Sequence, residues 1–178
     1  ILETGLGGRL DSVTACKSNI LLYTSISMDH HKILGNTLKK IANEKAQAII
    51  NNKQTIISVD QEHSINNILR SQAQRCNNSI EILNKNNYKS FDLKFLYGEH
   101  QIQNVNLVFQ TISNLNKKKI TKISTKQIHK SLYNTSWKGR FQIILKKPLI
   151  IYDVAHNKAS LKSFLQTYIN YTQQKHYN

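Results

Sequence analysis

The sequence predicts an α/β fold in which helices flank a parallel or mixed sheet. Short runs of apolar and β-branched residues, typical of buried strands, alternate with longer segments whose apolar residues recur every three or four positions. This alternation favours an α/β architecture. The 178 residues are enough for one ordinary domain or for two partial ones. In such folds we expect the functional residues beyond the carboxyl ends of the strands.

Three elements are expected before residue 50. The lead-in 1–3 is interpreted as the end of a strand, and 20–26 as a buried strand. A helix that runs through Ala48 follows, because its apolar residues recur at helical spacing and either Asn36 or Thr37 can cap its start.

The middle of the chain is predicted to hold another strand and two helices. Residues 55–59 form a short strand, and 61–84 form a long helix. Residues 91–97 are expected to be a strand or a turn. The apolar residues of 101–115 recur at spacings of three and four, which predicts an amphipathic helix.

The end of the chain is predicted to hold a helix, two strands and a closing helix, at 126–133, 141–145, 148–152 and 160–171. A Trp-Lys-Gly-Arg break separates the first of these helices from the strands. We therefore expect a domain boundary near Ser136.

The composition limits the class of function. The formal net charge is +15, which invites a nucleic-acid interpretation. However, 21 lysines outnumber 4 arginines and are spread along the whole chain, together with 20 asparagines. This pattern is typical of a compositional bias of the genome. No zinc-finger spacing or aromatic RNA-binding motif is present, so we expect no specific nucleic-acid partner, and a basic binding module remains a less favoured alternative.

Other classes are excluded more directly. The two cysteines, Cys16 and Cys76, are too few for a disulfide-dense scaffold. No apolar run reaches the roughly 20 residues that a membrane span needs, so no membrane partner is expected. The sequence opens without Met and without the basic and apolar regions of a signal peptide, which leads us to expect a fragment of a longer protein.

Five segments carry motifs that occur in a fixed order. They are ETGLGGRLD at 3–11, DH at 29–30 with LGNT at 34–37, IANEKA at 41–46, GEHQ at 98–101 with Asn104, and WKGRF at 137–141 with DVAHN at 153–157. In this order the motifs resemble those of the folylpolyglutamate synthase / dihydrofolate synthase family, within the Mur ligase superfamily. The resemblance implies that 1–136 is part of a Mur-ligase-type ATP-binding domain and that 137–178 begins a Rossmann-like C-terminal domain.

The resemblance also implies an activity. Enzymes of this family join L-glutamate to the carboxylate of folate or dihydropteroate, with ATP, through an acyl phosphate. Mg²⁺ is needed to neutralise the charge of the transferred phosphoryl group. We expect a monomer, and the cytoplasm is the default compartment because nothing in the sequence marks another one. The sequence leaves open whether the ancestor was a dihydrofolate synthase, a folylpolyglutamate synthase or both.

Three residues match the metal site of the family. Glu3 and His30 match ligands to Mg²⁺, and Lys45 matches a lysine that carries a carbamate. A carbamate would convert an ammonium into an anionic oxygen donor, which suits a hard cation. The resemblance thus assigns catalytic roles to Lys45 and His30. Without it, Glu3 could be a solvated carboxylate, His30 a loop residue bonded to backbone, and Lys45 a surface ammonium.

Four further residues match positions near the nucleotide: Asn104, Arg140, Asp153 and His156. The resemblance implies that Arg140 contacts phosphate, that Asp153 holds ribose or organises the hinge, and that His156 lies near the phosphates or adenine. An Asx-turn is the alternative for Asp153, and helix capping is the alternative for Asn104.

The chain also departs from the family. The phosphate loop of the family, of the Gly-x-x-Gly-Lys-Ser type, lies upstream of the first motif and does not occur in these residues. Gln47 and Val154 replace usual glycines, and Lys158 replaces a usual proline. We expect the β-branched Val154 to strain or reshape its loop. These departures predict an isolated chain without activity and keep open a non-catalytic remnant of the enzyme.

Overall fold

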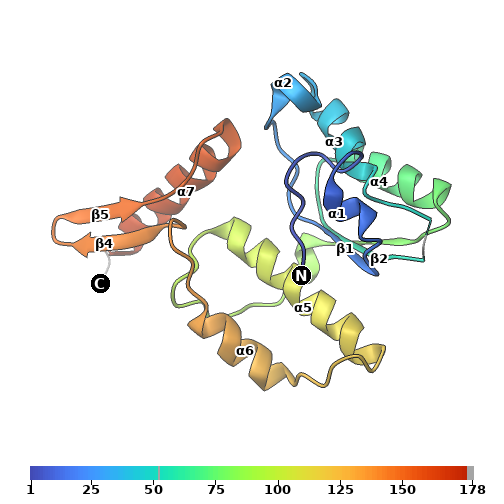
Figure 1. Ribbon diagram of the computed structural model, residues 1–178. Helices are drawn as coiled ribbons and strands as arrows, with labels where there is room; N and C mark the ends of the chain where they lie inside the picture. Colours follow the sequence, from blue (N-terminus) through green and yellow to red (C-terminus); the bar gives the residue numbers. More distant parts are fainter. Residues whose placement is uncertain (52, 176–178) are drawn as a thin grey trace. The chain divides into compact units, whose positions relative to one another are not determined.

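The computed structural model describes residues 1–51 and 53–175, which form two compact units. The N-terminal unit runs from Ile1 to Asn87, and the C-terminal unit begins at Tyr88 (Figure 1). The division follows how densely each part of the chain packs on itself and does not define an evolutionary domain. The domain boundary expected near Ser136 therefore stays a prediction.

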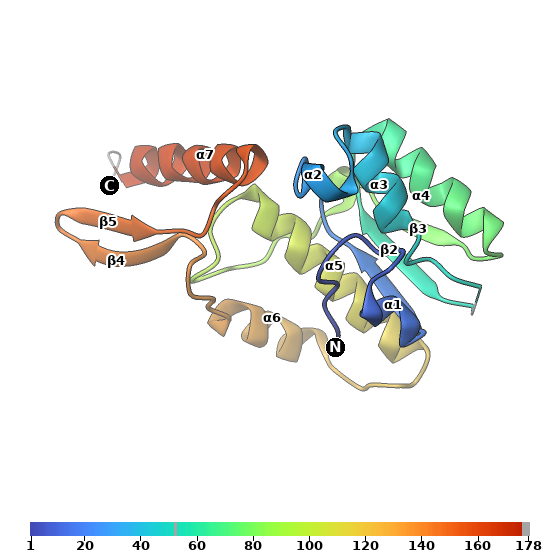
Figure 2. The same cartoon turned by 45° about the horizontal axis from the view of Figure 1, so that its top comes forward.

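The N-terminal unit is a parallel sheet with helices, which confirms the predicted α/β fold (Figure 2). Its elements are α1 (Ser12–Ala15), β1 (Ile20–Tyr23), α2 (His31–Leu34), α3 (Leu38–Ala46), β2 (Thr55–Val59), α4 (His63–Arg75), β3 (Ile80–Leu83) and the short 3₁₀ helix Lys85–Asn87. The strand order is β1-β2-β3, and both pairs are parallel, with Leu21 beside Ile56 and Ile57 beside Glu81. Helices α3 and α4 lie side by side on the sheet.

The core of this unit lies between the sheet and these two helices. Burial is nearly complete along β2, where Ile56, Ile57 and Val59 are at most 1% exposed, as expected of a central parallel strand. Helix α3 begins where the sequence predicts, because the Thr37 hydroxyl accepts a hydrogen bond from the amide of Lys40 at 3.2 Å.

Two predictions for this unit are wrong. The helix expected over 61–84 ends at Arg75, and Ile80–Leu83 forms β3 instead. Asn77 adopts a φ of 53°, which ends the helical path, and pairing with β2 then decides the structure of the next residues. Residues 1–3 form no strand and are exposed, since no neighbouring strand pairs with them.

The C-terminal unit holds two helices, a hairpin and a final helix. Its elements are α5 (Glu99–Lys117), α6 (Thr125–Asn134), β4 (Gln142–Lys146), β5 (Leu149–Tyr152) and α7 (Lys158–Lys175). Strands β4 and β5 are antiparallel. Residues 91–97 form no strand, and the apolar residues of this segment pack against α5 and α6 around Phe91 and Val105.

A buried asparagine fastens this segment to α5. The Asn106 side chain is 6% exposed, and its Oδ1 accepts a hydrogen bond from the Lys89 amide at 2.8 Å. Its Nδ2 donates to the carbonyls of Lys89 at 3.1 Å and Ile102 at 2.8 Å. Asn106 thus stands in for a missing backbone partner of the irregular segment.

Four aromatic rings connect α7 to the rest of the unit. Phe141, which precedes β4, packs against Tyr97, Phe164 and Tyr171, with ring centroids 5.2–5.8 Å apart. Other apolar side chains of α7, such as Leu165 and Ile169, are exposed.

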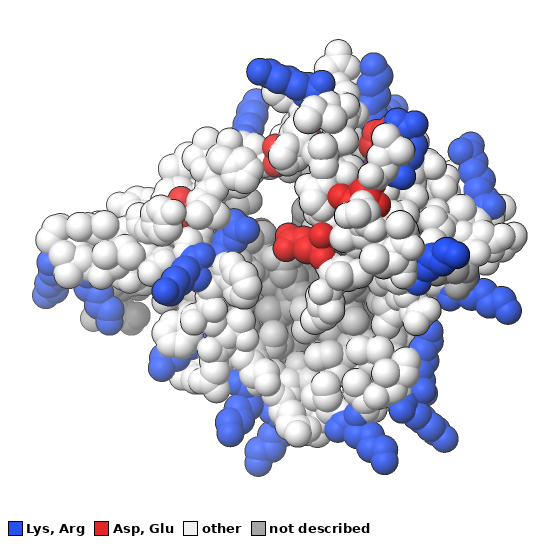
Figure 3. Space-filling view, viewed as in Figure 1, with Lys and Arg blue, Asp and Glu red and all other residues white. Residues whose placement is uncertain are grey.

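On the face seen in Figure 3, lysine and arginine side chains project from many places and do not gather into one patch. Within the described residues, no helix is long and apolar enough to span a membrane.

Asn106 provides a test of the C-terminal unit. Replacing it by alanine removes three hydrogen bonds and leaves two backbone groups of Lys89 without this partner. We expect the free energy of unfolding, measured in urea, to fall by about 2 kcal/mol. The control is Asn134→Ala, which removes one exposed hydrogen bond to the Lys130 carbonyl. It should change the free energy of unfolding by less than about 0.5 kcal/mol. Equal losses in both variants would contradict this role of Asn106.

Candidate functional site

A carboxylate ties the glycine-rich turn into a closed loop. One Asp11 oxygen accepts hydrogen bonds from the amides of Gly5 at 3.0 Å and Leu6 at 2.9 Å, and the other accepts from Val13 at 2.9 Å. The bond from Leu6, followed by that from Val13, lowers the pKa of Asp11 because it stabilises the charged form, and the nearby Lys45 ammonium adds to this effect. Asp11 therefore holds the turn together.

The same turn packs against the last turn of α3. A Cβ atom added to Gly8 would stand 2.7 Å from the carbonyl oxygen of Lys45 and 3.0 Å from that of Glu44, so only glycine fits there. The next residue, Arg9, pairs with Glu44 at 3.1 Å between Nε and Oε2. The segment that begins with Glu3 thus lies against the helix end that carries Lys45.

The turn also contacts α2, which follows His30. A Cβ atom added to Gly7 would stand 3.0 Å from Cδ2 of Leu34, the buried residue of α2. His30 itself has φ 49° and ψ 32°, the left-handed conformation that is uncommon for residues other than glycine. Strained backbone of this kind gathers at functional sites.

The three predicted metal ligands therefore belong to three segments that touch one another. Glu3 and His30 are exposed, and Lys45 is half-buried. Among the described residues, no three His, Cys, Asp or Glu side chains are placed together to hold a metal ion. Glu3 and His30 could offer two donors, and Lys45 would add an anionic oxygen donor if it carried a carbamate. The donor set fits Mg²⁺ on the condition that Lys45 carries a carbamate.

The two halves of the fifth motif lie together in the C-terminal unit. One Asp153 oxygen accepts a hydrogen bond from the Phe141 amide at 2.7 Å, and the other accepts from the Ala155 amide at 2.8 Å. The Val154 amide donates to the Gly139 carbonyl at 3.0 Å. Asp153 thus forms the Asx-turn considered above and also joins the two loops.

This junction holds one residue in a strained conformation. Phe141 has a φ of 45°, although it is 3% exposed and its ring packs in the aromatic cluster. The bond to Asp153 and this packing stabilise the conformation, which is costly for a residue with a side chain.

The structure shows no backbone strain at Val154, although its branched side chain was expected to strain or reshape the loop. Val154 is not among the residues with positive φ, so the backbone there does not need glycine. Instead, Gly139 has a φ of 74°, and a Cβ atom on it would stand 2.7 Å from Cγ1 of Val154. Glycine at 139 thus leaves room for the branched side chain at 154.

The remaining nucleotide-site residues occupy loop and helix positions. Arg140 and His156 are exposed, and the His156 ring nitrogen Nδ1 lies 2.9 Å from the Val154 carbonyl oxygen. The amides of His156 and Asn157 both donate to the Ser160 hydroxyl at 3.1 Å, so Ser160 shapes the loop before α7. The Asn104 side chain donates to Oε1 of Gln101 at 3.4 Å, one turn along α5.

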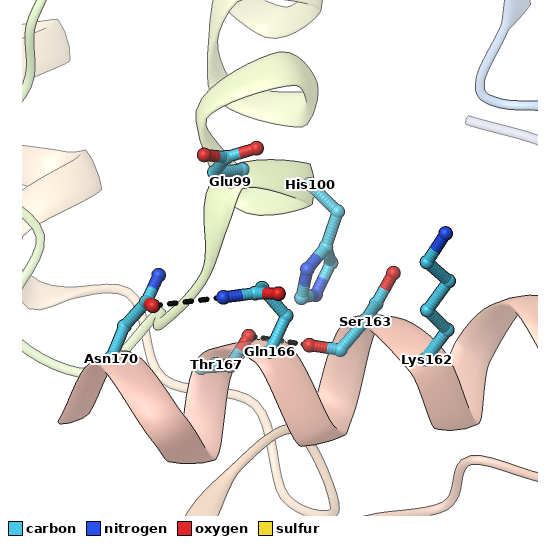
Figure 4. A pocket seen from close by; sticks show the side chains of 7 residues that line it. All are labelled: Glu99, His100, Lys162, Ser163, Gln166, Thr167 and Asn170. Atoms are coloured by element: carbon cyan, nitrogen blue, oxygen red, sulfur yellow. Dashed lines mark hydrogen bonds between the residues drawn. The ribbon is translucent and has the colours of Figure 1, made fainter. Parts of the chain in front are cut away.

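A polar pocket of about 380 Å³ lies between the start of α5 and α7 (Figure 4). Its lining residues are Glu99, His100, Lys162, Ser163, Gln166, Thr167 and Asn170. The His100 imidazole points from α5 toward α7. Burial lowers the pKa of His100; Asp153 opposes this shift, and Arg140 reinforces it. Tyr97, which directly precedes the fourth motif, packs against Phe141 of the fifth motif with ring centroids 5.2 Å apart, so the two motifs are neighbours.

The structure thus assembles two groups, one in each unit. The N-terminal unit brings together the segments of Glu3, His30 and Lys45. The C-terminal unit joins the loops of Arg140 and Asp153 and sets them beside the start of α5, with Asn104 further along α5 and His156 at the loop surface.

Sequence reasoning missed three residues that support these groups. The Thr14 hydroxyl donates to the Gly8 carbonyl at 2.6 Å, and the Tyr23 hydroxyl donates to the Lys45 carbonyl at 2.9 Å. Gln61 accepts a hydrogen bond from the Ile26 amide at 2.7 Å, which anchors the loop that leads to His30. Tyr23 and Gln61 bond to backbone 22 and 35 residues away, so no local pattern signals them, whereas Thr14 lies only six residues from Gly8.

Comparisons with known proteins support the motif-based resemblance. No protein-family model matches the chain. A dihydrofolate synthase/folylpolyglutamate synthase of Bacillus subtilis is 30% identical, over 94% of this chain and 44% of the relative. The Buchnera aphidicola protein of the same name, from the Acyrthosiphon pisum symbiont, is 36% identical, over 88% of this chain and 40% of the relative. The chain thus spans less than half the length of these curated relatives.

A solved structure shows the same fold. A complex of folylpolyglutamate synthase with AMPPCP and folate superposes with a TM-score of 0.85 at 21% identity, covering 95% of this chain and 46% of that protein. The comparisons confirm the family resemblance that the five motifs indicate and the α/β class of the fold.

The tight contact at Gly8 can be tested by adding one methyl group. We expect Gly8→Ala to lower the free energy of unfolding by about 2 kcal/mol, because the new Cβ collides with the backbone of α3. Gly5→Ala is the matched control, since its Cβ would meet only Oδ2 of Asp11 at 3.6 Å, and it should change stability by less than about 0.5 kcal/mol. Chemical denaturation of both variants gives the comparison, and a Gly8→Ala protein as stable as wild type would refute the contact.

The lowered pKa of His100 predicts that the stability of the protein depends on pH. The pKa of His100 is lowered in the folded protein, so below its ordinary value of about 6.5 the unfolded chain binds a proton that the folded chain does not. Stability should therefore fall as the pH drops from 6.5 toward the lowered pKa, and His100→Gln should remove this part of the slope. Unfolding at a series of pH values measures the effect. His63→Gln, at an exposed histidine, is the control, and an unchanged slope in His100→Gln would contradict the prediction.

Proposed function

We propose, from the relationship of this chain to the dihydrofolate synthase/folylpolyglutamate synthase family, that it is the central part of an ATP-dependent ligase. The substrates are ATP, L-glutamate and the carboxylate of folate or dihydropteroate. The observation that carries the proposal is the assembly of the family motifs into two groups, at the turn of Gly8 and at the loops of Asp153. We expect such an enzyme to work as a monomer in the cytoplasm.

The reaction needs two displacements. A carboxylate oxygen of the folate attacks the γ-phosphorus of ATP, the bond to the β-γ bridging oxygen breaks, and ADP leaves with an acyl phosphate formed. The amine of glutamate then attacks the acyl carbon, phosphate leaves, and the nitrogen loses a proton as the amide forms. Both steps need positive charge and hydrogen-bond donors placed beforehand around the phosphoryl group.

The N-terminal group would hold the cation. Glu3, His30 and a carbamate on Lys45 would be its ligands, and Mg²⁺ would supply charge neutralisation at the phosphoryl group. To form the carbamate, the Lys45 ammonium loses a proton, and the resulting amine attacks the carbon of CO₂. A second proton then leaves the nitrogen, so the ammonium is replaced by an anion.

The C-terminal group would meet the nucleotide. Arg140 is exposed and can offer its planar guanidinium to phosphate oxygens. The carboxylate of Asp153 accepts two backbone hydrogen bonds, which favours a role in organising the loops over one in holding ribose. His156 and Asn104 would lie along the nucleotide, in keeping with a relative whose solved structure contains AMPPCP.

Catalysis by this scheme needs a phosphate loop. No such motif occurs in these 178 residues, which span under half of the curated relatives. We therefore propose that polypeptide outside this stretch supplies the loop, and that the isolated stretch does not turn over substrate.

Turnover by the full-length protein tests the function. With ATP, Mg²⁺, glutamate and either dihydropteroate or folate, the full-length protein should release ADP and form a product one glutamate heavier, as seen by mass spectrometry. Arg140→Ala should lower this activity. Absence of glutamylated product with both acceptors would overturn the proposal and favour a non-catalytic remnant.

The carbamate can be tested on the isolated chain. Mn²⁺, observed by electron paramagnetic resonance, should bind more tightly when bicarbonate is present. Lys45→Arg keeps the positive charge but cannot form a carbamate, so it should lose this dependence. Lys39→Arg, on the exposed side of the same helix, is the control. A wild-type Mn²⁺ affinity that is the same with and without bicarbonate would contradict the proposed metal site.

A further inference from the structure

Tyr23 lies beneath the end of the helix that carries Lys45. It is the last residue of β1 and is 6% exposed. Its ring belongs to the core between the sheet and α3, beside Ala42 and Ala46. Its hydroxyl donates a hydrogen bond to the carbonyl oxygen of Lys45 at 2.9 Å.

That carbonyl is an unusual partner. Lys45 is the next-to-last residue of α3, and carbonyls in the last turn of a helix lack partners within the helix. The Lys45 carbonyl also accepts a bond from the Ala48 amide at 3.1 Å as the chain turns away. The hydroxyl of Tyr23 thus gives the helix end a contact to the sheet that the helix itself does not provide.

The glycine-rich turn also lies against this carbonyl. Gly8 approaches it too closely for any Cβ atom, and the Thr14 hydroxyl holds the Gly8 carbonyl at 2.6 Å. One backbone group of Lys45 is therefore the point where the sheet, the turn and α3 meet.

The Tyr23 hydroxyl is a dependable donor. Burial raises the pKa of Tyr23 far above its ordinary value, because the charged phenolate would lose its water. The hydroxyl is therefore a hydrogen-bond donor at neutral pH.

We propose that Tyr23 is a positioning residue for Lys45. By holding the Lys45 carbonyl against the glycine-rich turn, it fixes the direction in which the Lys45 side chain leaves the helix and so keeps the amine beside the segments of Glu3 and His30. This inference rests on the proposed function, since it assigns Tyr23 to the carbamate and cation site.

A purely structural role makes a different prediction. Tyr23→Phe keeps the ring and removes the hydroxyl. If Tyr23 only fills the core, another variant that destabilises the core by the same amount should affect the metal site as much as Tyr23→Phe does. If Tyr23 positions Lys45, the loss of the hydroxyl alone should act on the chemistry of Lys45. The comparison therefore needs a readout at Lys45 and a control that weakens the same core elsewhere.

The experiment uses the chain with ¹³C-labelled bicarbonate and Mn²⁺. The ¹³C signal of the carbamate measures its occupancy, and paramagnetic resonance measures Mn²⁺ affinity. We expect Tyr23→Phe to lower the Mn²⁺ affinity about 10-fold, the scale seen when a group that orients a metal ligand is removed, and to reduce the carbamate signal. Gly8→Ala disturbs the same carbonyl from the glycine-rich turn and should act in the same direction.

Ile65→Val is the control. Ile65 is buried in α4 within the same core, and its shortening should lower the thermal midpoint without changing the carbamate signal. Equal carbamate and affinity in Tyr23→Phe and wild type would overturn the inference while leaving the proposed function intact. A loss in Ile65→Val as large as in Tyr23→Phe would also overturn it. A wild-type chain without any carbamate signal would refute the proposed metal site itself.

Discussion

The close approach of Gly8 to the last turn of α3 is the constraint on which the N-terminal group depends. Without a side chain at this position, the turn comes within van der Waals contact of the carbonyls of Glu44 and Lys45. Asp11 can then close the turn through its three backbone hydrogen bonds, and Gly7 can rest on Leu34. Segments that are distant in sequence thereby become neighbours.

The C-terminal unit follows the same principle with different residues. Asp153 bonds to the amides of Phe141 and Ala155, while Gly139 leaves space for Val154. In both units a carboxylate of a motif binds backbone amides and a glycine permits close contact. We propose that the charged residues beside them, such as Lys45 and Arg140, bind the ligands. A carboxylate in a motif can therefore have a structural role, as Asp11 and Asp153 do, without being catalytic.

Much of the fold could be predicted from the sequence, because it is encoded locally. The cap at Thr37 and the periodicity of 101–115 have local signals, and both are confirmed, with α5 extending to Glu99–Lys117. Strand β3 could not be predicted, because its pairing with β2 overrides a helical pattern that continues past Arg75. The local propensity of residues 80–83 does not indicate that they pair with a distant strand.

The candidate site was predicted less evenly. The motifs identify residues such as His30 but not the groups that hold them, since Tyr23 and Gln61 bond to backbone 22 and 35 residues away. Their roles become visible only when the chain is folded. The expectation that Val154 strains its loop failed for the same reason, because Gly139 makes room for it from another loop.

The most direct measurement of the central claim is anomalous diffraction from crystals of this chain grown with Mn²⁺ and bicarbonate. If the N-terminal group is a cation site, an anomalous peak should lie against Glu3, His30 and a Lys45 side chain extended by carbamate density. An unmodified Lys45 with no peak beside it, in crystals that hold Mn²⁺ at high concentration, would contradict the account.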